Sequence, residues 1–262
     1  MSVDAQDSSL TRVRPFFEAL FARDPSGRSW LSALLAATPN GHEVLGELVE
    51  QPGYLSTLLA VRAMSGRLAA FEYPVAATRE LLAWYVEHPE RLRWPDRVEH
   101  SPGADRLRHA LLDDDPPGSR AKAQQRARQL VSTRSPTADE WWRFEGVDTL
   151  DCMLITDRLV VTVTGKRAEP LTPATEWYPV RSELVRNLEA ARHYAQGKAW
   201  GSLLISEHEL PEASTEALAR TLPESAPHLD DAGREALHRA YLGNLTWEQA
   251  SAAVGLPFES LP

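Results

Sequence analysis

An aspartate and a lysine flank a short apolar hairpin near the middle of the chain. The stretch LDCMLITDRLVVTVTGKR, residues 150–167, is typical of two β-strands joined by a tight turn, with Asp151 near its start and Lys166 near its end. Side chains alternate between the two faces of a strand, so Thr164 and Lys166 share one face. A two-residue turn pairs Asp151 with Thr164 on that face, whereas a three-residue turn directs Asp151 toward the core. The sequence leaves both registers open.

The simplest interpretation of the two charges is a surface ion pair, worth about 0–1 kcal/mol. The surrounding elements favour a second interpretation. From about Trp141 to Ser206 the chain reads strand, strand, helix, strand, in the stretches WWRFEGVDTLDCMLI, VTGKR, WYPVRSELVRNLEAARHYAQG and AWGSLLIS. In this order, and in an acid and a lysine at the shared end of two strands, it resembles bacterial members of the PD-(D/E)XK nuclease superfamily, which has the restriction endonuclease-like fold.

This resemblance implies a divalent metal site that hydrolyses phosphodiester bonds. In the family, an Asp on one strand and a Glu-x-Lys on the next bind Mg²⁺ and position a water. Carried to this chain, Asp151 is the principal ligand of Mg²⁺ or Mn²⁺, and the carbonyl of Gly165 is a backbone ligand. Lys166 orients the attacking water or neutralises the phosphate. Mg²⁺ keeps several waters, so one or two carboxylates suffice, and a bound metal lowers the pKa of its water.

Thr164 departs from the family pattern, because this chain has TGK where the family has Glu or Asp before Gly-Lys. Either the site is inactive or a carboxylate comes from elsewhere. At about 100° per residue, Glu183 lies along one edge of the apolar stripe of a helix predicted over 180–196, with Glu189 facing solvent. Glu183 is therefore the first candidate for a relocated ligand, unless it only pairs with an arginine of its own helix. Glu145, on the approach to the first strand, is the second candidate.

Two functions follow from the resemblance. The first is a Mg²⁺-dependent nuclease acting on DNA, with Asp151, Lys166 and Glu183 as its catalytic residues. The alternative is a catalytically degenerate nuclease fold that binds nucleic acid or protein, which Thr164 and the net charge of −9 favour. The choice between DNA and RNA stays open.

Basic residues near the hairpin, and on a separate helix, could contact phosphates. The stretch 118–134 holds five basic residues and no acid, a local charge pattern that suits nucleic acid. The simpler interpretation is a solvated helix face. The residues predicted to contact nucleic acid are Arg167, Arg181, Arg186, Lys122 and Arg126.

The hairpin needs surrounding elements to position it. Residues 8 to about 95 show apolar residues three or four apart, separated by turn signals such as DPSG, TPNG and QPG, which predicts helices. We therefore predict an all-helical domain over 1–95 and a nuclease-like α/β domain over 96–262, with a mixed central sheet flanked by helices. The helical domain could dock a protein partner, and a homo-oligomer stays open.

The composition limits the protein class. Hydrophobic residues make up 43% and charged residues 25% of the chain, as in ordinary globular proteins. No apolar run reaches the ~18 residues of a membrane span, so no membrane partner is predicted. The N-terminus lacks the pattern of a secretory signal. The single cysteine, Cys152, cannot form an internal disulfide and is expected as a small buried residue. Together these features favour the cytoplasm.

Overall fold

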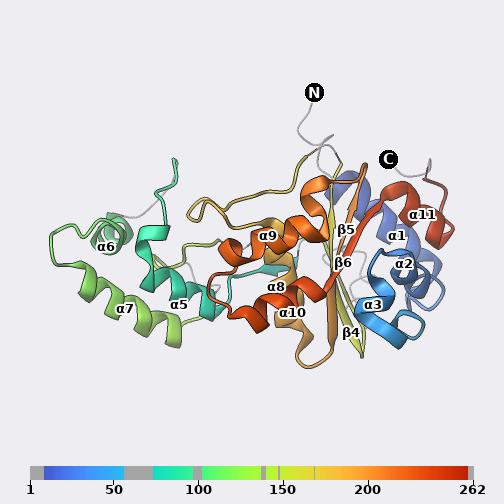
Figure 1. Ribbon diagram of the computed structural model, residues 1–262, viewed down its shortest axis with the longest axis horizontal. Helices are drawn as coiled ribbons and strands as arrows, with labels where there is room; N and C mark the ends of the chain where they lie inside the picture. The colour runs from blue at the N-terminus through green and yellow to red at the C-terminus, as the bar shows by residue number, and fades with distance from the viewer. Residues whose placement is uncertain are drawn as a thin grey trace.

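The computed structural model describes residues 9–55, 73–96, 102–136, 140–146, 148–167 and 169–258. At its centre lies a four-stranded mixed sheet with helices around it (Figure 1). The antiparallel hairpin β3–β4 forms one half, and β5 and β6 continue the sheet parallel to β4. The strands, in their order across the sheet, are β3 (Cys152–Ile155), β4 (Leu159–Gly165), β5 (Ala199–Ser206) and β6 (Tyr241–Thr246). The predicted α/β class with a mixed sheet is confirmed.

The N-terminal helices cover one face of this sheet, together with the helix that follows β6 (Figure 1). Phe16, Leu34 and Trp247 belong to the same hydrophobic core as Val161 and Leu203 of the sheet. Alternate strand residues point to this face, which explains how one set of aliphatic side chains meets the helices. The elements on this face are η2 (Ser9–Val13), α1 (Arg14–Arg23), α2 (Leu31–Ala37), α3 (Gly41–Leu45), η3 (Gly46–Val49) and α11 (Trp247–Val254).

The other face of the sheet is covered by α8 (Glu183–Ala195), α9 (Thr215–Ser225) and α10 (Asp231–Arg239), with the short η5 (Pro211–Ala213) before α9. Leu188 of α8 packs with Leu204 of β5, and Ala190 packs with Val160 of β4. Helix α8 follows the proline-rich segment after β4 and leads back to β5, which it joins by a parallel crossover. This connection brings the start of α8 to the carboxyl end of β4.

A helical lobe forms the far end of the molecule (Figure 1). It consists of α5 (Arg79–Glu87), η4 (Pro89–Arg91), α6 (Pro102–Leu112) and α7 (Arg120–Thr133). Trp142, Phe144 and Tyr178 lie in the core of this lobe, so both flanks of the hairpin are anchored in it. A two-stranded antiparallel sheet of β1 (Tyr73–Val75) and β2 (Asp148–Leu150) leads from the lobe to the central sheet.

The hydrophobic cores do not follow the predicted boundary at residue 95. Helices α1 to α3 share a core with the central sheet, whereas α5 packs with α6 and α7, which come after residue 95. The apolar spacing of the sequence predicts these helices but does not say which surface each one covers. The helical pattern over 56–72 lies outside the described residues. In the part of the chain that is described, no helix is long and apolar enough to cross a membrane.

Candidate functional site

The β3–β4 hairpin has the register of the two-residue turn. Cys152 pairs with Val163, so Asp151, one residue earlier, lies opposite Thr164. Directly opposed residues of an antiparallel pair share a face, and Asp151 is therefore on the face that α8 covers. Its Oδ2 accepts a hydrogen bond of 2.8 Å from the backbone N–H of Gly165. This contact holds the carboxylate at the carboxyl end of β4.

Helix α8 brings Glu183 to Lys166 at the same end of the sheet. The Lys166 Nζ lies 2.9 Å from Oε1 of Glu183, and their side chains are only 10% and 14% exposed. The other carboxylate oxygen, Oε2, accepts a hydrogen bond of 2.9 Å from the N–H of Thr172. The indole Nε1 of Trp247 donates to the carbonyl of Lys166 at 3.0 Å. Each residue of the ion pair is therefore held by a second contact, Glu183 by Thr172 and Lys166 by Trp247.

Thr164 of β4 is buried against α8. It is 1% exposed, and its Oγ1 accepts a hydrogen bond of 2.5 Å from the side-chain amide of Asn187. Thr162, two residues earlier on the same face, donates to the backbone carbonyl of Asn187 at 3.1 Å. Asn187 was not predicted as a site residue. Its position four residues after Glu183, on the same edge of the helix, is the sequence signal that identifies it.

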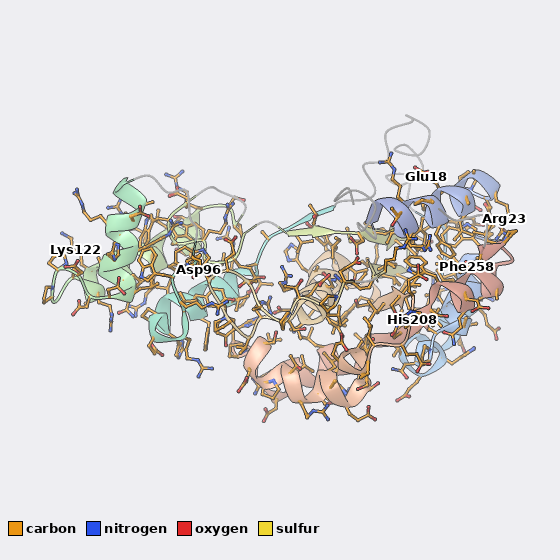
Figure 2. All side chains as sticks on the ribbon, turned by 90° about the horizontal axis from the view of Figure 1, so that it is seen from above. Glu18, Arg23, Asp96, Lys122, His208 and Phe258 are labelled. Carbon is orange, nitrogen blue, oxygen red and sulfur yellow. The ribbon has the colours of Figure 1, made fainter. Side chains whose placement is uncertain are left out.

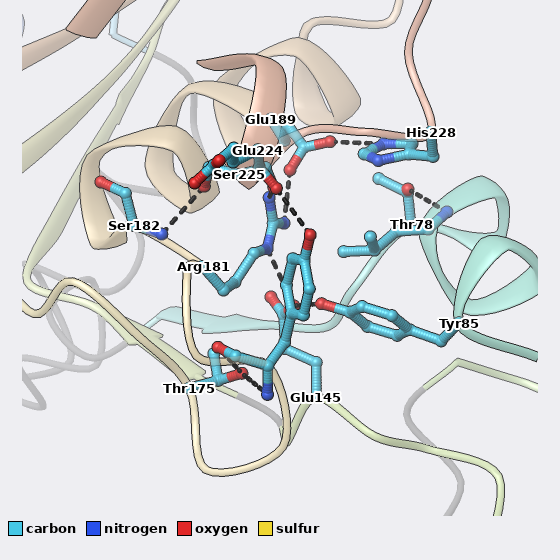
Figure 3. Close-up of polar contacts among 12 residues, drawn as sticks. Thr78, Tyr85, Glu145, Thr175, Arg181, Ser182, Glu189, Glu224, Ser225 and His228 are labelled. Atoms are coloured by element: carbon cyan, nitrogen blue, oxygen red, sulfur yellow. Dashed lines mark hydrogen bonds and ion pairs between the residues drawn. The ribbon is translucent and has the colours of Figure 1, made fainter. Parts of the chain in front are cut away.

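Three residues singled out in the sequence lie in a separate buried charge cluster (Figure 3). The Arg181 Nε lies 2.9 Å from Oε2 of Glu145, and its other guanidinium nitrogens contact Glu189 and the carbonyl of Ser225. His228 Nε2 lies 2.7 Å from Oε1 of Glu189. This buried cluster joins the helical lobe to α8.

The cluster corrects three predictions. Arg181 is 1% exposed and enclosed by carboxylates, so its guanidinium does not face a surface where a phosphate could bind. Glu145 accepts hydrogen bonds from Arg181 and Tyr85, which makes it a counter-ion in this cluster rather than a ligand beside Lys166. Glu189 is buried instead of facing solvent. Arg181 and His228 cover this side of α8, which lies outside the apolar stripe of the helix.

The electrostatics of the cluster follow from burial and pairing. Burial by itself raises the pKa of Glu189, but Arg181 and the hydrogen bond from His228 together hold that pKa below its usual value. Burial lowers the pKa of Arg181, and the carboxylates of Glu145 and Glu189 more than reverse this. Burial, reinforced by Glu145, raises the pKa of Tyr85 well above its usual value. Glu189 and Arg181 therefore stay charged at neutral pH, and Tyr85 stays neutral.

The other predicted phosphate contacts divide into two groups. Arg167 is half-buried, with its Nε 3.6 Å from Oε1 of Glu207, and Arg186 is half-buried beside Asn187 at a cavity of about 20 Å³. Lys122 and Arg126 are exposed on α7 in the helical lobe. Figure 2 shows Lys122 at one end of the molecule and His208, which follows β5 near the end of β4, in the other half. The first group lies near the hairpin, and the second lies far from it.

The donors at the end of β4 are oxygens. Asp151 and Glu183 contribute carboxylates, and Gly165 has the backbone carbonyl that the resemblance implies as a ligand. No cluster of three or more His, Cys, Asp and Glu side chains that could hold a metal ion occurs within the described ranges. Mg²⁺ is commonly held by one or two carboxylates together with waters, so the chemistry of this donor set fits that ion.

We compared the chain with protein families, curated proteins and solved structures. No family, no curated protein and no solved structure matches the chain. The function must therefore be argued from the site itself.

Proposed function

We propose that the chain is a metal-dependent nuclease with a restriction endonuclease-like core, in which Glu183 replaces the acid missing at Thr164. The observation that carries this proposal is the 2.9 Å contact between Lys166 Nζ and Glu183 Oε1. It puts a helix-borne carboxylate beside the lysine, at the strand end where Asp151 is also held. The order of strand, strand, helix and parallel strand supports the same core.

The residues that would hold a divalent ion are Asp151 and Glu183, with the carbonyl of Gly165. A bound Mg²⁺ or Mn²⁺ supplies a water of lowered pKa and neutralises charge on the phosphate. Lys166 carries three N–H donors, and its contact with Glu183 accounts for one of them. The ammonium can therefore hold a water or a phosphate oxygen while its position is fixed by Glu183.

The burial of this ion pair strengthens its electrostatic role. Both side chains are largely withdrawn from water. Charges interact more strongly in such a buried environment than at the surface. Arg167, which follows Lys166 in the chain, and Arg186, which lies next to Asn187 on α8, are the proposed contacts to the phosphates of the substrate, for which we propose DNA. Lys122 and Arg126 would meet only a substrate long enough to reach the helical lobe.

Cleavage of plasmid DNA and of single-stranded oligonucleotides in Mg²⁺ or Mn²⁺ tests the proposal. Replacing one electrostatic group of a catalytic site commonly lowers the rate about 10²–10³-fold, and we expect losses of that size for Lys166→Ala and Glu183→Gln. Glu235→Gln is the matched control, because Glu235 pairs with Arg239 at 3.1 Å on the exposed side of α10. Undiminished cleavage by Lys166→Ala would reject the proposal.

A second candidate function is a degenerate nuclease fold that binds nucleic acid or protein without cleaving. The observation that favours it is the burial of Thr164 against Asn187, which leaves the strand position without an acid. This candidate predicts no saturable binding of Mg²⁺ or Mn²⁺ in calorimetry. A metal isotherm that disappears in Asp151→Asn would count against it.

A further inference from the structure

Three polar contacts join β4 to α8 in a column. Thr162, Thr164 and Lys166 alternate along one face of the strand, and Glu183 and Asn187 lie one turn apart on the facing helix. Lys166 meets Glu183 at the solvent end, and Thr164 meets the amide of Asn187 one step further in. Thr162 contacts the backbone carbonyl of Asn187 below that. Past this point the interface is apolar, where Val160 packs on Ala190.

The middle contact fixes how far α8 can shift along the strand. Thr164 is 1% exposed and Asn187 is 6% exposed, so neither group can exchange its partner for water. A buried amide without a hydrogen bond is unfavourable, which ties Asn187 to the hydroxyl. Because Glu183 is four residues from Asn187, any displacement of the amide also moves the carboxylate relative to Lys166.

We infer that Asn187 is a positioning residue, which acts through the hydroxyl of Thr164 to hold the Glu183 carboxylate at Lys166. The inference rests on the proposed metal-dependent function and deepens it. The residue at 164 then has a different role from the acid of the family pattern, since its hydroxyl anchors the helix that carries the carboxylate. Hydrogen-bond partners that orient a metal ligand typically change metal affinity 10–100-fold when they are removed.

Isothermal titration of the full-length protein with Mn²⁺ tests this inference. Thr164→Val keeps the shape of the side chain and removes the hydroxyl, and we expect the Kd for Mn²⁺ to rise about tenfold or more. Thr164→Ser restores a hydroxyl and should bring the Kd back close to the wild-type value. If Thr164→Val does not fold by circular dichroism, Thr164→Ala and Thr164→Ser give the same comparison, because alanine lacks the hydroxyl without adding volume.

Thr162→Val is the matched structural control. It removes a hydrogen bond between the same strand and the same helix residue, but that bond reaches the backbone of Asn187 and not its side chain. We expect it to lower the melting temperature while leaving the Kd for Mn²⁺ near wild type. A purely structural role for Thr164 predicts instead that both valine variants weaken Mn²⁺ binding in proportion to their loss of melting temperature.

Each outcome decides one of the claims. Three results would overturn the positioning role while leaving the metal site intact. These are a wild-type Kd for Mn²⁺ in Thr164→Val, losses of affinity in both valine variants in proportion to their losses of melting temperature, and no recovery of the Kd in Thr164→Ser. A wild-type protein without a Mn²⁺ isotherm would overturn the proposed function and the positioning role together.

Discussion

At the scale of single residues, Arg181 connects three separate parts of the molecule. Its guanidinium contacts Glu145 before the hairpin, Glu189 on α8 and the carbonyl of Ser225 at the end of α9. The side chain lies two residues before Glu183, at the start of α8. The cluster thus helps to set where α8 begins, and so where the candidate carboxylate stands.

Arg181→Met should strongly destabilise the protein, because it removes the guanidinium that pairs with the buried carboxylates of Glu145 and Glu189. Breaking a buried pair on one side commonly costs about 3–5 kcal/mol, which for a chain of this size lowers the melting temperature by about 10 °C. Arg239→Met is the control, since the Arg239 side chain is 72% exposed and surface changes usually stay within about 0.5 kcal/mol. Similar melting temperatures for the two variants would contradict the account.

The same cluster predicts how stability depends on acid. The pKa of Glu189 in the folded protein lies below its ordinary value of 4.5. Its contribution to the free energy of unfolding is therefore complete above that value and is lost as the pH falls through the lower folded pKa. Melting curves recorded downward from pH 7 should show a smaller acid-induced decrease in Glu189→Gln than in the wild type. An equal decrease of the melting temperature in both proteins would show that the acid sensitivity comes from groups other than Glu189.

At the scale of elements, one glycine lets the N-terminal helices dock on the sheet. Gly243 of β6 has φ +101°, and a Cβ built on it would lie 2.8 Å from Cγ of Pro39, between α2 and α3. The neighbouring N–H of Asn40 donates to the carbonyl of Leu242 at 3.0 Å. The turn before α3 therefore packs directly on the strand backbone.

Gly243→Ala should cost about 2 kcal/mol or more, through the left-handed backbone and the overlap with Pro39. Gly255→Ala separates these two causes, since Gly255 also has a positive φ, +65°, but nothing lies within 4 Å of an added Cβ. We expect about 1 kcal/mol for Gly255→Ala from the backbone alone. Denaturant unfolding measures both, and equal losses would show that the contact with Pro39 does not restrain the strand.

The sequence predicts the elements of the site better than their surroundings. Alternation in the hairpin and the helical angle of Glu183 depend only on local geometry, and the structure has Asp151, Lys166 and Glu183 on one face of the sheet. Glu189 was assigned to solvent because a charge on the polar side of a helix is usually exposed. Its burial depends on Arg181 and His228, which reach it from other segments, and no local pattern contains that information.

At the scale of the whole molecule, helices that come before and after the hairpin in the chain cover the two faces of the sheet. Helices α1 to α3 cover one face, and α8 to α10 cover the other. Apolar spacing cannot reveal this arrangement, because an amphipathic helix fits any apolar surface of suitable shape. Residues before and after the hairpin are therefore needed to complete the layer structure that holds the site.

A chain limited to residues 96–262, the predicted nuclease-like domain, should not fold cooperatively. It would lose α1, α2 and α3 and so expose Val161, Leu203 and Ile205, which are 0–1% exposed in the intact protein. It would also remove α5 from the core of the helical lobe. Circular dichroism and thermal unfolding would check this, and a sharp unfolding transition in the shortened chain would show that the N-terminal helices form a separate unit.

The most direct test of the proposed metal site is a crystal structure of the protein soaked in Mn²⁺, recorded with anomalous scattering. We predict an anomalous peak within ligand distance of the carboxylates of Asp151 and Glu183, with Lys166 beside it. Crystals that contain Mn²⁺ but show no peak there, with the contact between Lys166 and Glu183 unchanged, would contradict it.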